Sequence, residues 1–223
     1  MFSLKKNMGL FWKQEQSLTI LSVILVIHVF VVIPFGERTL LEQVVFLLFY
    51  ISLLATGMVL ITTNKVIRTI AQIVLALLAI SRTSSLFVSE PIEIANDLII
   101  VFYCVFLIWV VLKRTFAAGP VTFHRIQGAI VVYLLVSFLF ALLFHVLYLL
   151  DPGTAFKGLV SGDYREFLYF SLTTLTTVGY GDISPAIASV RSLANLESLI
   201  GQLYPAILIA RLVSMEFEYS KKR

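Results

Sequence analysis

The sequence predicts an all-α membrane protein with six transmembrane helices and one shorter helix that enters the membrane and returns to the same side. Of the 223 residues, 59% are hydrophobic and only 13% are charged, and the mean hydropathy is +0.97. This is far more apolar surface than a soluble domain of this size buries. In addition, six apolar segments are each long enough, at roughly 20 residues, to cross the hydrocarbon layer as a helix.

The six predicted spans are separated by residues that favour turns. Proline, glycine, asparagine or acidic residues interrupt the apolar pattern between successive spans. The predicted spans are residues 17–35, 40–62, 66–88, 93–112, 125–149 and 190–213. The predicted domains are an interfacial or cytoplasmic N-terminal segment (1–16), a four-helix membrane domain (17–112), a linker (113–124), a second membrane domain (125–215) and a short cytoplasmic tail (216–223).

The distribution of charge predicts the orientation of these spans. The net charge is +4. If the N-terminus starts inside, most lysines and arginines fall on the inner side, as expected for cytoplasmic segments. Both termini are therefore expected in the cytoplasm, with the chain in the plasma (inner) membrane. Orientation accounts for the basic excess, so no nucleic-acid partner is expected. The lone cysteine, Cys104, lies in an apolar run and indicates neither a disulfide framework nor a cysteine metal site.

The connection between the fifth and sixth spans, residues 150–189, is too long for a tight turn. Its stretch YREFLYFSLTTLTT predicts a short helix that ends before it crosses the membrane. Because both flanking spans are fixed, this helix must enter from the outer side and return there. Non-helical backbone at membrane depth is tolerated only where protein buries it or water lines it. The residues from Thr177 onward are therefore expected to line a water-filled path.

The segment TTVGYGD, residues 176–182, has the composition of a cage for a dehydrated monovalent cation. Such an ion needs several oxygen ligands, and an extended backbone whose carbonyls face one axis supplies them. Gly179 and Gly181 permit backbone angles that residues with a Cβ resist. The hydroxyl of Thr177 adds a further oxygen at the inner end.

In this arrangement Val178 and Tyr180 point away from the axis and support the strand from behind. One strand cannot enclose an ion, whereas four strands around a fourfold axis can. Here the sequence resembles the tetrameric potassium-channel family, on the segment TTVGYGD, the short helix before it and the span on each side, over residues 125–215. The resemblance implies a homotetramer in membrane lipid that carries K⁺ as the transported ion and needs no cofactor. The filter that it implies comprises the carbonyls of Thr177, Val178, Gly179 and Tyr180, the Thr177 hydroxyl, and Gly181.

The resemblance also implies which residues support the filter. Thr176 and Asp182 flank it, and Tyr169 and Phe170 fall where family members often have aromatic residues that form a cuff around it. Thr173 falls where some members have a glutamate behind the filter. This departure removes a carboxyl partner of Asp182, so the inactivation behaviour of those members does not transfer to this chain.

The first four spans resemble, in number only, the voltage-sensing module that accompanies many such pores. Steep voltage dependence needs several arginines in the fourth span. Residues 94–112 contain neither arginine nor lysine. We therefore expect weak or absent voltage sensing, and packing, lipid contact and partner binding all remain open as roles for these spans.

Three further features of the chain each have two interpretations. Gly201 and Pro205 lie one helical turn apart in the sixth span, where the missing proline N–H produces either a gating hinge or a static kink. Glu197 either forms a hydrogen bond behind the pore helix, for example to a threonine, or concentrates cations in the cavity. His28 and His145 lie in apolar runs as core residues or, alternatively, as pH sensors.

The sequence therefore predicts a passive, potassium-selective channel. The alternatives are a channel-like potassium transporter subunit and a non-conducting partner subunit. Transporters of that kind carry four pore-like repeats in one chain, whereas this chain has one filter segment and no internal repeat. A membrane enzyme is not expected, because the sequence shows no paired intramembrane acids, histidine cluster or nucleophile with its base.

Overall fold

A computed structural model describes residues 18–32, 90–117 and 121–221 of the chain. The second and third predicted spans, 40–62 and 66–88, lie outside these residues, as does the N-terminal segment 1–16. The described residues form two compact units, which we treat separately. One contains the described residues of Met1–Phe87 and Leu107–Val132, and the other contains those of Val88–Phe106 and Tyr133–Arg223.

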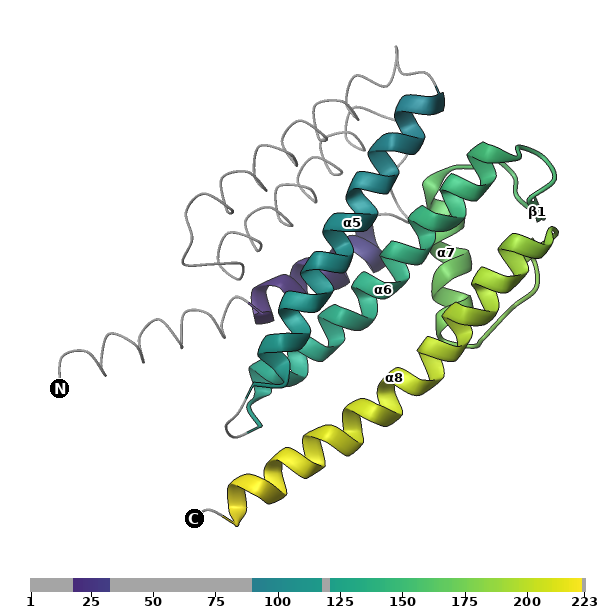
Figure 1. Cartoon of the computed structure of the whole chain (residues 1–223). Helices are drawn as coiled ribbons and strands as arrows, with labels where there is room; N and C mark the ends of the chain where they lie inside the picture. Colours follow the sequence, from purple (N-terminus) through teal and green to yellow (C-terminus); the bar gives the residue numbers. More distant parts are fainter. Residues whose placement is uncertain (1–17, 33–89, 118–120, 222–223) are drawn as a thin grey trace. The chain divides into compact units, whose positions relative to one another are not determined.

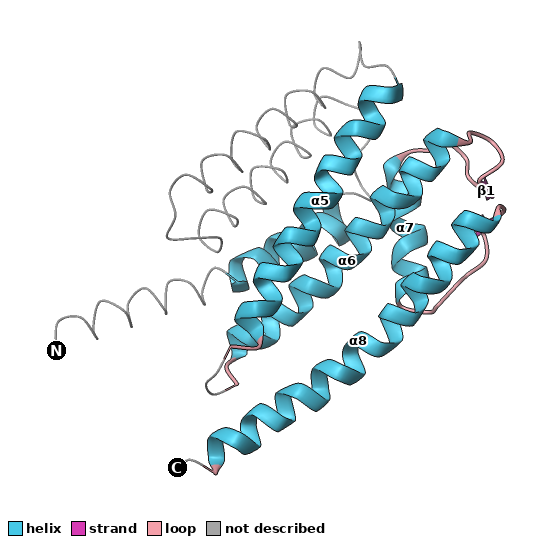
Figure 2. Cartoon of the chain, viewed as in Figure 1, coloured by secondary structure: helices cyan, strands magenta, loops and turns pink. Residues whose placement is uncertain are grey.

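Helices make up most of the described residues (Figures 1 and 2). A helix over 18–27 continues as the π-helix η1 (His28–Val32). The longer helices are α5 (Glu90–Thr115), α6 (Phe123–Leu150) and α8 (Ala188–Ser220), and the shorter α7 (Tyr164–Leu175) lies between α6 and α8 in the sequence.

Three of the described helices are long and apolar enough to cross a membrane. Their spanning segments, Pro91–Thr115, Phe123–Leu150 and Ala188–Phe217, contain the fourth, fifth and sixth predicted spans. The apolar helix Leu18–Val31, within the first predicted span, is shorter. The described residues thus support a mostly helical membrane protein with three candidate spans, and six spans remain a prediction.

The core of the second unit lies where α6 packs against α7. The part of α6 in this unit is apolar on almost every side, which suits a helix surrounded by other helices. Phe144 of α6 and Phe167 of α7 are fully buried. Phe156, from the connection between the two helices, packs against both rings at centroid distances of 5.9 and 5.5 Å. These contacts hold α7 against α6.

Two short strands, β1 (Phe156–Lys157) and β2 (Ser184–Pro185), pair in antiparallel fashion. We did not predict these strands from the sequence. The pairing joins the segment before α7 to the segment after residues 176–182, and the amide N–H of Ala186 extends it by donating to the carbonyl of Ala155 at 2.9 Å. The backbone on both sides of α7 is therefore held together at one end of that helix.

Candidate functional site

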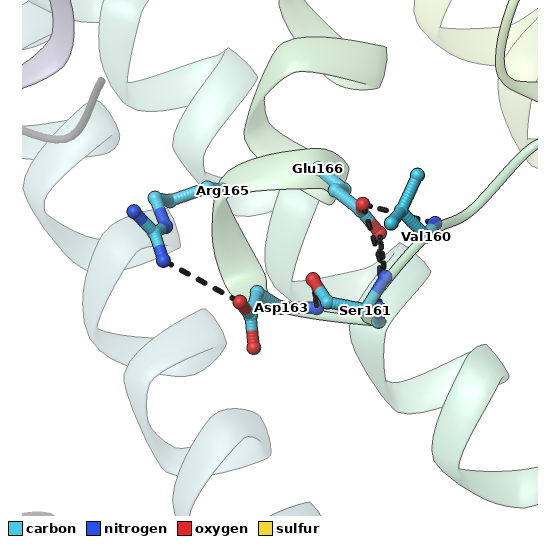
Figure 3. Close-up of polar contacts among 6 residues, drawn as sticks. Val160, Ser161, Asp163, Arg165 and Glu166 are labelled. Carbon is cyan, nitrogen blue, oxygen red and sulfur yellow. Dashed lines mark hydrogen bonds and ion pairs between the residues drawn. The ribbon is translucent and has the colours of Figure 1, made fainter. Parts of the chain in front are cut away.

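The site is built on α7, whose N-terminal end is fixed by a carboxylate. Glu166 accepts hydrogen bonds from the backbone N–H groups of Val160 (3.0 Å), Ser161 (3.2 Å) and Gly162 (3.0 Å) (Figure 3). Glu166 is the third helical residue after the N-cap Asp163, the position from which a glutamate reaches back to free N–H groups. The loop that leads into α7 is thereby ordered by a residue of the helix itself.

The middle of α7 carries an aromatic face that packs away from residues 176–182, which we call the filter segment after the role that the sequence predicts for it. Phe170, which we expected beside the filter, has its ring 4.9 Å from that of Phe144 and 5.4 Å from that of Phe156. Within one chain, the structure therefore brings Tyr169 to the filter segment and places Phe170 in the core. Adjacent residues of a helix face different directions. Because both residues are aromatic, residue type alone does not show which of them faces the filter segment.

The C-terminal end of α7 holds the base of the filter segment through its carbonyls. The carbonyl of Thr173 accepts hydrogen bonds from the backbone N–H groups of Val178 (2.9 Å) and Gly179 (3.1 Å). The hydroxyl of Thr173 donates to the carbonyl of Phe170 at 3.0 Å. Thr173 therefore contacts the filter segment through its backbone carbonyl. Its side chain, which we expected to support the filter, bonds within α7 instead.

These hydrogen bonds fix the direction of the filter carbonyls. The N–H of Val178 shares a peptide group with the carbonyl of Thr177, and the N–H of Gly179 shares one with the carbonyl of Val178. No cis peptide bond occurs in the described residues, and in a trans peptide N–H and C=O point in opposite directions. Because both N–H groups face α7, the carbonyl oxygens of Thr177 and Val178 point away from α7.

The backbone of the filter segment is not uniformly extended, which differs from our expectation. Thr177, Gly179 and Gly181 have positive φ values of 59°, 53° and 83°, whereas Val178 and Tyr180 do not. A positive φ costs little at glycine but is uncommon for a β-branched residue such as threonine. A Cβ at Gly179 or Gly181 would have no atom within 4 Å, so conformation rather than space favours glycine there.

The other end of the filter segment is held by Tyr169. Its hydroxyl donates to the carboxylate of Asp182 at 2.8 Å, and its ring stacks on that of Tyr180 with a centroid distance of 6.3 Å. The hydrogen bond from Tyr169 keeps the pKa of Asp182 below its usual value, and the same bond raises the pKa of Tyr169. A tyrosine hydroxyl thus occupies the role of partner to Asp182 that Thr173 cannot fill.

Residues 176–182 are exposed in the single chain. Val178 is 53% exposed and Tyr180 is 72% exposed, although both are residues that we expected to support the strand from behind. The hydroxyl of Thr176 bonds to the carbonyl of Leu172 at 2.6 Å, within the last turn of α7. One chain therefore presents the segment without enclosing it.

Glu197 of α8 lies behind α7 and is fully buried. Its Oε1 accepts a hydrogen bond from the hydroxyl of Ser171 at 2.5 Å. The partner is thus a serine of α7 rather than a threonine. Sequence reasoning missed Ser171 because no pattern in α7 shows which of its polar residues faces α8.

Gly201 of α8 lies against the last residue of α7. A Cβ at this position would be only 1.8 Å from the carbonyl oxygen of Leu175, so the two backbones approach as closely as glycine allows. The helix α8 continues through Pro205 without a break. The hinge and the static kink both stay predictions, and close packing is a role of Gly201 that the sequence did not reveal.

The two histidines occupy different surroundings. His145 of α6 lies 2.6 Å from Asp97 of α5 through Nδ1, and both side chains are buried. This contact explains two polar residues in apolar runs by mutual hydrogen bonding. His28 is buried in η1. Within the described residues, no group of three or more His, Cys, Asp or Glu is arranged to hold a metal ion.

Comparison with known proteins addresses the same part of the chain. Residues 123–218, which include α6, α7, the filter segment and most of α8, match a protein family described as "Ion channel". Protein LctB of Bacillus caldotenax is 38% identical to this chain over 69 residues, which are 31% of this chain and 50% of LctB. The chain thus spans half the length of this curated relative. No solved structure gives a significant match.

The family match supports a function as an ion channel. Together with the apolar helices, it supports an integral membrane protein that transports ions. A function as an ion channel also favours a protein that is not an enzyme.

Proposed function

We propose that this chain is a subunit of a potassium-selective channel, in which four copies surround a central pore lined by residues 177–181. The observation that carries the proposal is the direction of the filter carbonyls. The N–H groups of Val178 and Gly179 bond to Thr173 of α7, so the oxygens of Thr177 and Val178 face the opposite side. Rings of such carbonyls replace the hydration shell of K⁺ in potassium filters.

The exposure of the segment supports a fourfold assembly. One chain offers one set of oxygens, and a dehydrated cation needs oxygens on all sides. Val178 and Tyr180 are apolar or aromatic and more than half exposed in the single chain. Neighbouring copies that cover these side chains would close the ring and bring four sets of carbonyls to one axis.

Conduction is passive and depends little on voltage. The described helix α5 contains no arginine or lysine before Lys113 and Arg114 in its last turn, so it lacks the charges that a membrane potential would move. We place the channel in the plasma membrane with both termini in the cytoplasm. K⁺ is the transported ion, and Thr177, Val178, Gly179 and Tyr180 supply its ligands.

The test is reconstitution of the purified full chain alone into liposomes. We expect reversal potentials close to the K⁺ equilibrium potential under K⁺/Na⁺ gradients, and block by barium. Gly179→Ala is the test variant, because its methyl group meets no atom of its own chain within 4 Å but its φ of 53° is unfavourable for alanine. This variant should keep its assembly and lose selectivity.

Three outcomes would contradict the proposal. Equal permeability of Na⁺ and K⁺ through the wild-type protein would exclude a potassium filter. An intact assembly that carries no current would favour the non-conducting partner subunit, and flux that needs a coupled ion gradient would favour the transporter.

A further inference from the structure

The helices α6, α7 and α8 meet in two polar layers that lie one helical turn apart. The first layer contains Ser137, Ser171 and Glu197, and the second contains Tyr133, Leu175 and Gly201. On each helix the two residues are four positions apart, which places them on one face in successive turns. We call these two layers the three-helix seam.

The first layer is a buried chain of hydrogen bonds. The hydroxyl of Ser171 lies 2.5 Å from Oε1 of Glu197 and 3.0 Å from the hydroxyl of Ser137. It also lies 2.7 Å from the carbonyl of Ser137, which is a second acceptor for the same proton. A hydroxyl has one proton to donate and two lone pairs. Both interactions with side chains are satisfied if Ser137 donates to Ser171 and Ser171 donates to Glu197. All three residues are at most 1% exposed, so water does not compete for these groups.

The second layer fixes the last carbonyl of α7 from two sides. The hydroxyl of Tyr133 donates to the carbonyl of Leu175 at 3.2 Å, and the Cα of Gly201 lies against the same carbonyl. The ring of Tyr133 also packs against that of Tyr204, one turn beyond Gly201, at a centroid distance of 5.9 Å. Tyr133 therefore contacts α7 and α8 at the same time.

The last turn of α7 transmits these contacts to the filter segment. The carbonyl of Thr174 accepts from the hydroxyl of Ser198 of α8 at 3.3 Å and from the N–H of Thr177 at 3.0 Å. The neighbouring carbonyl of Thr173 holds Val178 and Gly179. One helical turn of α7 thus bonds to α8 on one side and to the base of the filter segment on the other.

We propose that Tyr133, Ser171 and Glu197 are positioning residues that couple α8 to the base of the filter, so that a movement of α8 changes the fraction of time in which the filter conducts. The coupling rests on the proposed function, because it assumes that residues 177–181 conduct. It assigns a role to the hydroxyl of Tyr133, a residue far from the filter in sequence.

Single-channel recording of the reconstituted full chain tests the coupling. Tyr133→Phe removes one hydroxyl and keeps the ring. Loss of one hydrogen bond of ordinary strength should lower the ratio of conducting to non-conducting dwell times about fivefold. Tyr148→Phe is the matched control, because Tyr148 is on the same helix and its ring packs on Phe167 at 5.3 Å, away from the seam. It should leave the ratio unchanged.

Substitution at Glu197 separates positioning from folding. Glu197→Gln keeps an oxygen that accepts from Ser171, whereas Glu197→Leu has a similar volume and no acceptor. We expect Glu197→Gln to stay within about twofold of wild type and Glu197→Leu to fall by at least the fivefold of a lost hydrogen bond. The relative permeability of Na⁺ should rise in Glu197→Leu and Tyr133→Phe, which a defect limited to assembly would not produce.

The outcomes distinguish the two proposals. If wild type is potassium-selective and Tyr133→Phe and Glu197→Leu have wild-type dwell times and selectivity, the coupling is overturned and the proposed function stands. If Glu197→Leu fails to assemble, Ser171→Ala tests the first layer in its place, because it removes only one hydroxyl. If Tyr133→Phe fails to assemble, the variants of the first layer decide. If wild type does not select K⁺, the proposed function itself fails.

Discussion

Substitution of Gly201 by alanine tests whether close packing of α8 on α7 holds the site together. Two effects of opposite sign compete. Alanine favours a helix interior over glycine by about 0.8 to 1 kcal/mol, which would stabilise α8. The added Cβ, however, would lie 1.8 Å from the carbonyl oxygen of Leu175 and 2.7 Å from its carbonyl carbon.

The size of the required displacement decides between these effects. Ordinary contact begins at 3.4 Å, so the oxygen and the methyl group must separate by 3.4 minus 1.8, or 1.6 Å. Both groups belong to helix backbone or are bonded to it directly, so no side-chain rotation relieves the contact. Overpacking of this kind costs about 1 to 3 kcal/mol. Because no side-chain rotation relieves this contact, we expect a cost in the upper half of that range, which exceeds the gain in helix propensity. The net loss in the free energy of unfolding is then about 1 to 2 kcal/mol per subunit.

The assay is the thermal unfolding midpoint of the detergent-solubilised full chain, together with K⁺ flux into liposomes. Gly201→Ala should lower the midpoint and reduce flux, because the base of the filter segment is displaced with Leu175. Pro205→Ala is the comparison that addresses the hinge, since it restores an N–H donor to α8 without entering the contact with Leu175. A midpoint for Gly201→Ala above that of wild type would show that helix propensity dominates and would refute the packing argument.

Two further predictions concern hydrogen bonds made by side chains of α7. Tyr169→Phe should raise the pKa of Asp182 towards its ordinary value of about 3.9, because it removes the hydrogen bond that lowers this pKa. In wild type the bond stabilises the filter at pH values above that ordinary pKa, and the stabilisation is lost as pH falls through the lower folded pKa. The acid midpoint of K⁺ conduction should therefore move to higher pH in the variant, and an unchanged midpoint would contradict this. Glu166→Ala should speed hydrogen exchange at the amides of residues 160–162, which lose their acceptor. Asp163→Asn is its control, since the 3.4 Å pair of Asp163 with Arg165 is partly exposed and such pairs contribute little; equal exchange rates in the Glu166 variant and wild type would refute the prediction.

The sequence predicts the three long described helices closely. The predicted spans 93–112, 125–149 and 190–213 each lie within an observed helix, which extends a few residues further at both ends. Apolar length and the flanking prolines and glycines are local properties, so they can be read from the chain alone. The short helix α7 was predicted for the same reason.

Contacts between segments far apart in sequence could not be predicted. The strands β1 and β2 have two residues each and form only because the two connections meet. The hydrogen bond between Ser171 and Glu197 depends on how α7 is rotated against α8. The positive φ of Thr177 opposes the preference of a β-branched residue, so its residue type argues against the conformation that the structure shows.

The pairing of β1 with β2 restricts where the connection between α6 and α7 tolerates change. A Cβ at Gly158 would lie 1.8 Å from the carbonyl of Asp182, whereas one at Gly153 would meet no atom within 4 Å. Lengthening the chain around Gly158 would therefore shift the residue that ends the filter segment. A peptide tag or fluorophore for labelling the protein belongs near Gly153, where added atoms would meet no other part of the chain within 4 Å.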